Sequence, residues 1–173
     1  RIIWDGSKSR SKWIEAPHIY KKDGYYYLMV AEGGTFINHS VMMARCTAID
    51  GTYEICPRNP IVSHRHLPPL SDISVTGHAD IVETQNGEWW MVLLAVRPYQ
   101  NDSSISTTEN CGHFHYNLGR ETFMAPVIWD EDGWLRLANE TGLINREERL
   151  PNLPAAYVPL ADPNDDFESD TLA

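Results

Sequence analysis

The feature that most restricts the fold of this sequence is a hairpin frame that occurs three times. Each copy has an alanine, an aliphatic residue three positions later, an Asp or Asn four positions after that, and then a glycine. The copies are Ala16, Ile19, Asp23 and Gly24; Ala79, Val82, Asn86 and Gly87; and Ala125, Ile128, Asp132 and Gly133. Asp-Gly and Asn-Gly between β-forming flanks favour two-residue type I′ turns. The frame therefore predicts three β-hairpins.

The spacing of the hairpins indicates how they are arranged. Equivalent glycines are 63 and 46 residues apart, which matches roughly 40 to 50 residues for a four-stranded propeller blade with loop insertions. Strands predicted over 40–46 and 52–56 complete the first blade. No stretch of 11 or more residues has a convincing helical period, so helix is predicted to be minor. A β-sandwich also has closely spaced strands, but it does not predict a repeated frame of fixed length. We therefore predict an all-β fold, a β-propeller with about three blades in this chain.

The predicted domain organisation follows from that blade count. The smallest closed propellers have four blades, so three units predict an incomplete propeller over residues 1–160, with its earlier blades before Arg1. The sequence beyond Pro151 becomes rich in Pro, Asn, Asp and Ala. Residues 161–173 are therefore predicted to form a linker toward a further domain.

Composition excludes several classes of function. With 24 acidic and 14 basic residues the net charge is -10, which argues against a nucleic-acid partner because phosphate is held by clustered Lys and Arg. The longest apolar run, Trp89–Val96, is far shorter than the ~20 residues that span a bilayer. The three cysteines have no C-x-x-C spacing, so no zinc site is predicted. Compartment and oligomeric state stay open.

The repeat frame also predicts where a site would form. Innermost strands line the central channel of a propeller, so the residues just before them meet at one mouth of the channel. The position before the alanine is Glu15, His78 and Met124. The alternatives are a solvated loop carboxylate for Glu15 and a buried, hydrogen-bonded histidine for His78. Met124 is predicted to serve packing rather than chemistry.

Five segments of the sequence resemble glycoside hydrolase family 43. They are residues 13–28 (WIEAPHIYKKDGYYYL), 31–35 (AEGGT), 77–80 (GHAD), 86–90 (NGEWW) and 118–123 (LGRETF). The resemblance implies a five-bladed β-propeller, of which this chain is the C-terminal part. It also implies an exo-acting, inverting glycosidase that cleaves β-1,4-xylo-oligosaccharides or arabinoxylan-derived α-L-arabinofuranosyl groups. A non-catalytic carbohydrate-binding propeller is the alternative function.

The resemblance assigns Glu15 as the general acid that protonates the departing glycosidic oxygen. An inverting enzyme needs a second carboxylate as base, about 6.5 to 9.5 Å away, and the resemblance places that base before Arg1. Asp5 is not assigned this role, and Asp80 is predicted to be structural. The chain alone is therefore expected to carry the acid without the base and to be inactive.

The resemblance makes Arg120, Thr35 and His78 substrate-binding residues of the terminal sugar subsite. For Arg120 the alternative is a surface salt bridge. No cofactor is required and no metal ligand is assigned, although some family members hold Ca²⁺ or water near the equivalent of His78. Trp13, Phe36 and Phe114 are candidate subsite walls, because sugar C–H faces stack on rings. Most of the Tyr25–Tyr27 and Trp89–Trp90 clusters are instead predicted to be core.

Overall fold

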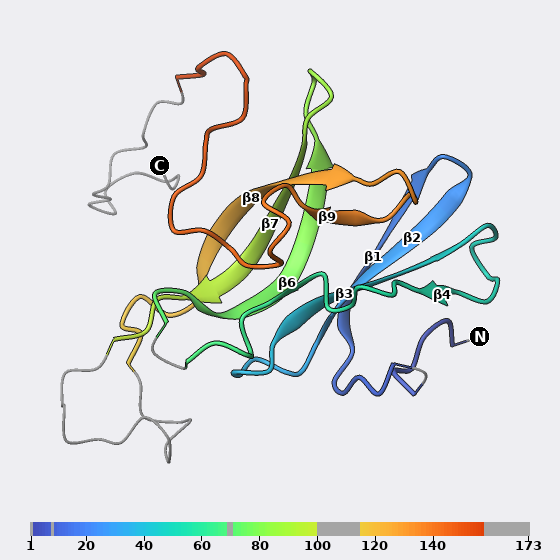
Figure 1. Ribbon diagram of the computed structural model, residues 1–173, viewed down its shortest axis with the longest axis horizontal. Coiled ribbons are helices and arrows are strands. Elements are labelled where there is room, and N and C mark those ends of the chain that lie inside the picture. The colour runs from blue at the N-terminus through green and yellow to red at the C-terminus, as the bar shows by residue number, and fades with distance from the viewer. Residues whose placement is uncertain (1, 8, 69–70, 100–114, 158–173) are drawn as a thin grey trace, which may run out of the picture.

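The computed structural model describes residues 2–7, 9–68, 71–99 and 115–157, and its regular elements there are all strands (Figure 1). The strands are β1 (Glu15–Lys22), β2 (Tyr25–Glu32), β3 (Ser40–Cys46), β4 (Glu54–Ile55), β5 (Val62–Ser63), β6 (Ser74–Glu83), β7 (Trp89–Val96), β8 (Glu121–Trp129) and β9 (Leu135–Leu137). The all-β prediction is confirmed. Among the described residues no helix exists that could cross a membrane.

The first sheet is antiparallel and follows the chain in the order β1-β2-β3-β4, with β5 paired to β3. Its first hairpin closes between Lys22 and Tyr25. The two residues between them, Asp23 and Gly24, have φ angles of 47° and 83°. Both angles lie in the left-handed region that a type I′ turn requires, so this predicted turn is confirmed.

The second sheet has the order β6-β7-β8-β9. The third copy of the frame is therefore not the start of a third blade, because β8 pairs with β7 along its length, from Trp89↔Val127 to Ala95↔Glu121. The described strands form two blades rather than three. The frame marks hairpins in general, and a four-stranded antiparallel blade contains an inner and an outer hairpin.

The turns of the second sheet also differ from the prediction. Only Gly87 and Gly133 have positive φ, at 83° and 77°, and the Asn or Asp before each does not. In the first of these loops the Thr84 N–H donates to the Glu88 carbonyl at 2.8 Å, which leaves three residues in the loop. Such loops combine a type I turn with a left-handed glycine, so the glycines were predicted correctly and the loop length was not.

The core lies between the two sheets. Buried side chains from β2 and β3, such as Met29 and Met43, form one cluster with Ile81, Met91 and Leu93 of the second sheet. Tyr27 belongs to this cluster, and the partly buried Tyr25 and Trp89 pack against it, as expected for inter-blade packing. Trp90 is buried outside this cluster, with the Arg149 guanidinium 5.0 Å from its ring centroid. A smaller cluster on the opposite face of the first sheet includes Leu28 and Val30 and is covered by Trp4 and Ile14.

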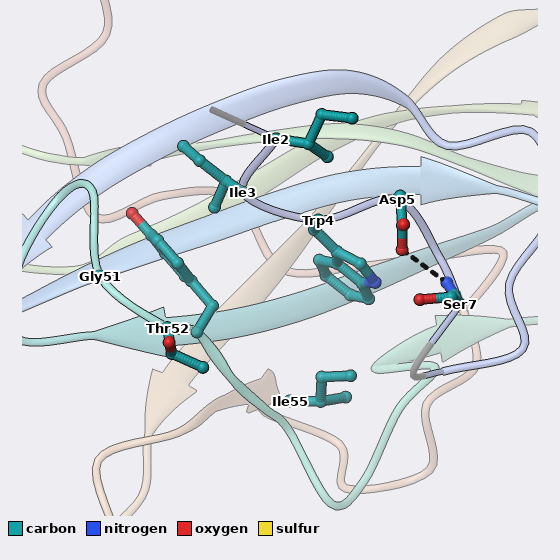
Figure 2. A pocket seen from close by; sticks show the side chains of 9 residues that line it. Ile2, Ile3, Trp4, Asp5, Ser7, Gly51, Thr52 and Ile55 are labelled. Atoms are coloured by element: carbon teal, nitrogen blue, oxygen red, sulfur yellow. Dashed lines mark hydrogen bonds between the residues drawn. The ribbon is translucent and has the colours of Figure 1, made fainter.

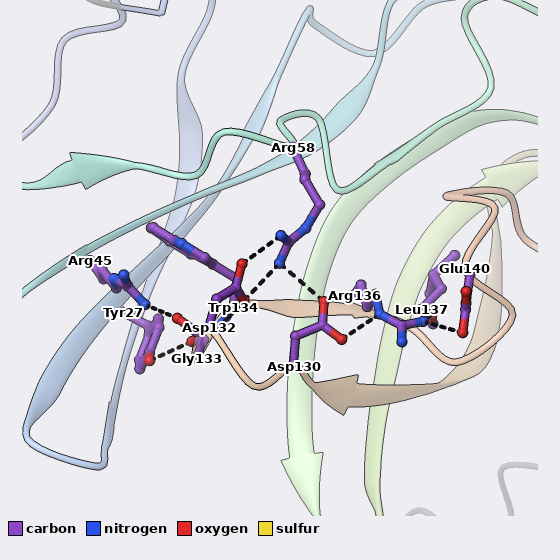
Figure 3. A network of polar contacts seen from close by, with 10 residues as sticks. All are labelled: Tyr27, Arg45, Arg58, Asp130, Asp132, Gly133, Trp134, Arg136, Leu137 and Glu140. Atoms are coloured by element: carbon purple, nitrogen blue, oxygen red, sulfur yellow. Dashed lines mark hydrogen bonds and ion pairs between the residues drawn. The ribbon is translucent and has the colours of Figure 1, made fainter.

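A polar network joins the sheets at the end where the hairpin turns lie (Figure 3). Arg58 bridges Asp132 at 2.7 Å and Asp130 at 3.1 Å. The Arg45 guanidinium lies 4.1 Å from the Trp134 ring centroid and donates to the Asp132 carbonyl at 2.7 Å. These contacts fix the relative position of the two sheets from the end opposite to Glu15.

Candidate active site

Glu15 is the first residue of β1, where it pairs with Ala31, and it is exposed. The register shifts between Glu15 and His18, and Ala16 has a φ of 47°. A non-glycine residue at positive φ is uncommon, and bulges next to active sites re-aim side chains. The strand therefore starts with an irregularity that leaves the Glu15 carboxyl accessible.

β6 is irregular at its corresponding end. Its register to β7 shifts twice, on either side of Gly77, and Val75 and His78 have φ angles of 57° and 54°. Left-handed conformations at such residues cost on the order of 1–3 kcal/mol each. His78 is exposed, so the alternative of a buried, satisfied histidine is wrong.

Arg120 lies at the same end of the second sheet as His78. β6 and β8 both run antiparallel to β7, so both strands begin at the same end of the sheet. Leu94 pairs with Gly77 on one side and with Thr122 on the other, and the exposed Arg120 directly precedes β8. Met124 lies on β8, the third strand of the sheet, where it pairs with Val92 of β7. It therefore does not belong to an innermost strand. Its equivalence with Glu15 and His78 is therefore corrected.

The buried His39, just before β3, interacts electrostatically with Glu15, His78 and Arg120. Burial lowers the pKa of His39, and the charges of His78 and Arg120 lower it further, while the Val75 carbonyl and Glu15 oppose the shift. Glu15, His78 and Arg120 are therefore all within electrostatic reach of one imidazole. Sequence reasoning missed His39 because it lies outside the repeat frame. Gly77, next to His78, is a sequence signal for such a residue, because its missing side chain makes room for the His39 ring.

The loop between β2 and β3 carries Thr35 and Phe36 and packs against Trp13, two residues before Glu15. Gly33 N–H donates to the Lys12 carbonyl at 2.9 Å, and a Cβ on Gly34 would lie 3.2 Å from the Trp13 ring. Trp13 and Phe36 are 66% and 62% exposed, and Thr35 is exposed. Exposed rings of this kind suit stacking on sugars. Phe114 lies outside the described residues.

Two other carboxylates, on β6 and β2, are engaged in structural contacts. Asp80 accepts hydrogen bonds from the Tyr20 hydroxyl and, at 2.8 Å, from the Ile81 N–H. Burial and this carboxylate raise the pKa of Tyr20. The buried Glu32 accepts from Ser40 at 2.8 Å and from Arg65 at 2.7 Å. Asp80 thus joins β1 to β6, in agreement with the structural role predicted for it.

The described residues do not form a metal centre. No group of three or more His, Cys, Asp and Glu side chains that would hold a metal ion occurs among them. Calcium takes roughly six to eight oxygen ligands, whereas His78 presents imidazole nitrogens. The described part of the chain therefore does not by itself fit a calcium ion at His78.

A pocket of about 210 Å³ lies elsewhere, between the N-terminal segment and the β3–β4 connection (Figure 2). Its lining combines apolar side chains such as Ile2, Ile3 and Trp4 with polar groups. Asp5 also lines it and accepts a hydrogen bond from the Ser7 N–H at 2.9 Å. The pocket contains none of the predicted site residues, so Asp5 stays outside the candidate active site.

The described strands thus form two adjacent blades of a β-propeller, with an accessible carboxyl, an arginine and exposed aromatic rings. The chain belongs to glycosyl hydrolases family 43, whose family model matches residues 1–135. It is part of the five-bladed propeller of that family, as predicted.

The relatives are named as xylosidases, arabinosidases or arabinofuranosidases. A xylosidase/arabinosidase of Butyrivibrio fibrisolvens is 47% identical over 76% of this chain and 23% of its own length. A non-reducing end α-L-arabinofuranosidase of Bacteroides ovatus is 39% identical over 91% of this chain and 27% of its own length. The solved xylan β-1,4-xylosidase of Bacillus halodurans aligns with a TM-score of 0.79 at 40% identity, covering 94% of this chain and 28% of that one. The chain thus spans about a quarter of the length of these relatives.

Proposed function

We propose that this chain is the acid-bearing segment of an exo-acting, inverting glycoside hydrolase. Its substrates are β-1,4-xylo-oligosaccharides or arabinoxylan-derived α-L-arabinofuranosyl groups. The observation that supports this best is that Glu15 is exposed at the start of β1, while His78 and Arg120 are exposed at one end of the second sheet, all within electrostatic reach of His39. The relatives named as xylosidases and arabinofuranosidases support the substrate class.

In this proposal Glu15 donates its proton to the glycosidic oxygen of the leaving group. A carboxylic acid that is exposed at the start of a strand can reach a bound sugar and act as its general acid. The base is a second carboxylate on the opposite face of the sugar. The family resemblance places this base outside these 173 residues, and the hydrogen bonds that hold Asp80 and Glu32 within the fold agree with that placement.

The terminal sugar is held by Arg120, Thr35 and His78. The guanidinium presents a planar fork of donors that matches vicinal hydroxyls, and the threonine hydroxyl and the imidazole add single hydrogen bonds. Trp13 and Phe36, both exposed, form walls against the C–H faces of the substrate. Neither a metal nor another cofactor takes part in these contacts.

The test is Glu15→Gln in the full-length protein that contains this segment. For xylosides or arabinosides with poor leaving groups, kcat should fall by about 10²- to 10⁴-fold, because their departure requires protonation. Affinity for xylose or arabinose, measured by calorimetry, should change little. Glu83→Gln is the matched control, because Glu83 is exposed at the opposite end of an inner strand. Undiminished turnover by Glu15→Gln would rule out the acid role.

The same experiment separates the alternative function. A non-catalytic carbohydrate-binding propeller would bind the sugars with the same residues and release no product, even as wild type. Sugar binding without hydrolysis by the wild-type full-length protein would therefore favour that alternative over the hydrolase.

A further inference from the structure

His39 is a buried ionisable residue that the proposed mechanism leaves without a role. Its side chain is 2% exposed and it directly precedes β3. Its backbone N–H donates to the Phe36 carbonyl at 2.8 Å, which closes the loop that carries Thr35. Its Nδ1 lies 3.2 Å from the Val75 carbonyl on β6. His39 therefore connects the Thr35 loop of the first sheet to the innermost strand of the second.

The segment of β6 that His39 contacts is conformationally strained. Val75 and His78 both have positive φ, at 57° and 54°. For a β-branched residue such as Val75 this conformation is an outlier, and it persists only where the surroundings impose it. The hydrogen bond from Nδ1 to the Val75 carbonyl is one contact that does so.

The imidazole ring also occupies the space next to Gly77. A Cβ built on Gly77 would lie 2.5 Å from Cδ2 and Nε2 of His39 and 2.6 Å from its Cε1. These distances are far below van der Waals contact, so the ring packs directly against the bare Cα. Gly77 lies between the two register shifts of β6. The ring thus fixes how closely the irregular segment approaches the first sheet.

We propose that His39 is a positioning residue for the glycosidase reaction: it fixes the irregular segment of β6 against the first sheet and so sets the placement of His78 and Arg120 relative to Glu15. This inference rests on the proposed function. The contacts of His39 with Val75 and Gly77 lie directly before His78 in the chain, and Glu15, His78 and Arg120 all interact electrostatically with its ring. Its lowered pKa keeps the ring neutral near pH 7, with Nδ1–H as the donor to Val75.

A matched control for His39 is present in the same chain. His64 is 4% exposed, its Nδ1 lies 2.8 Å from the Ile73 carbonyl, and its Nε2 accepts the Ile144 N–H at 2.8 Å. It too has a pKa lowered by burial, but the side chain that acts on it electrostatically is His66 rather than Glu15, His78 or Arg120. Substitution of His64 therefore reports the structural cost of losing a buried histidine without disturbing the site.

The experiment compares His39→Asn and His64→Asn in the full-length protein, at a temperature where circular dichroism shows both folded. Misplacement of a reacting group by about 1 Å costs roughly 10²-fold in rate. We therefore expect His39→Asn to lower kcat about ten- to hundredfold and to raise KM, and His64→Asn to change either by less than about twofold. Equal kcat values for the two variants would overturn the proposal.

A second pair of variants directly tests the packing of the His39 ring against Gly77. Gly77→Ala alone should lower kcat, because its Cβ meets the His39 ring. In the His39→Asn background the smaller side chain makes room for that Cβ, so adding Gly77→Ala should cost less than about twofold. Equal, additive losses in the two backgrounds would contradict the proposed packing role.

Failure of the proposed function is distinguishable from failure of this inference. A wild-type protein that binds xylose or arabinose without hydrolysis would disprove the hydrolase, and positioning is then measured by sugar affinity. Weaker binding by His39→Asn than by His64→Asn would support the positioning role, and equal binding would overturn it.

Discussion

At the scale of single residues, the two buried histidines make the stability of this protein depend on pH. Burial lowers the pKa of both His39 and His64, so each is neutral in the folded state at pH values where the unfolded chain, with a pKa of about 6.5, is protonated. The unfolded state then binds more protons, and stability falls as the pH falls. The ion pair between Arg58 and Asp132, at the end of the sheets where the hairpin turns lie, responds to pH over a different range.

We predict that the free energy of unfolding decreases between pH 7.5 and pH 5, measured by urea titration at both pH values. His64→Asn should reduce this pH dependence as well as overall stability, because Asn has no ionisable group. Arg58 holds the pKa of Asp132 at about 2, below the ordinary 3.8, so the contribution of Asp132 is lost only below about pH 4. An unchanged pH dependence in His64→Asn would refute the assignment to this histidine.

At the scale of elements, the hairpins could be predicted from sequence and their sheet membership could not. Gly24, Gly87 and Gly133 all have the positive φ that the frame implies, because a tight turn is specified by adjacent residues. The pairing of β7 with β8 joins segments separated by more than twenty residues, and no local pattern encodes it. The frame therefore predicts the third hairpin correctly, but not the sheet to which this hairpin belongs.

The turn glycines differ in their surroundings, which gives a prediction for the hairpins. Replacing Gly24 by Ala strains the backbone, with about 1–2 kcal/mol expected, but its Cβ would meet nothing within 4 Å. At Gly133 the Cβ would also lie 3.1 Å from Arg45 Nη1 and 3.4 Å from the Tyr27 hydroxyl. Gly133→Ala should therefore destabilise the protein more than Gly24→Ala in urea unfolding. Equal effects would show that the Arg45 contacts adjust freely.

At the scale of the whole molecule, the candidate site depends on how two sheets pack. The sequence predicted Glu15, His78 and Arg120 from the frame and from the family resemblance, and the fold puts all three within reach of His39. His39 itself escaped prediction because its importance arises only where the sheets meet, at Val75 and Gly77. Such a role depends on packing between distant segments rather than on any motif.

The division of the reaction between this chain and the rest of the protein gives the last prediction. An inverting hydrolysis needs an acid and a base on opposite faces of the sugar, and Asp80 and Glu32 are each held by hydrogen bonds within the fold. The 173-residue chain expressed alone, with strand content verified by circular dichroism, should release no xylose or arabinose from aryl glycosides, while the full-length protein should. Turnover by the chain alone that Glu15→Gln abolishes would mean that the base lies within these residues.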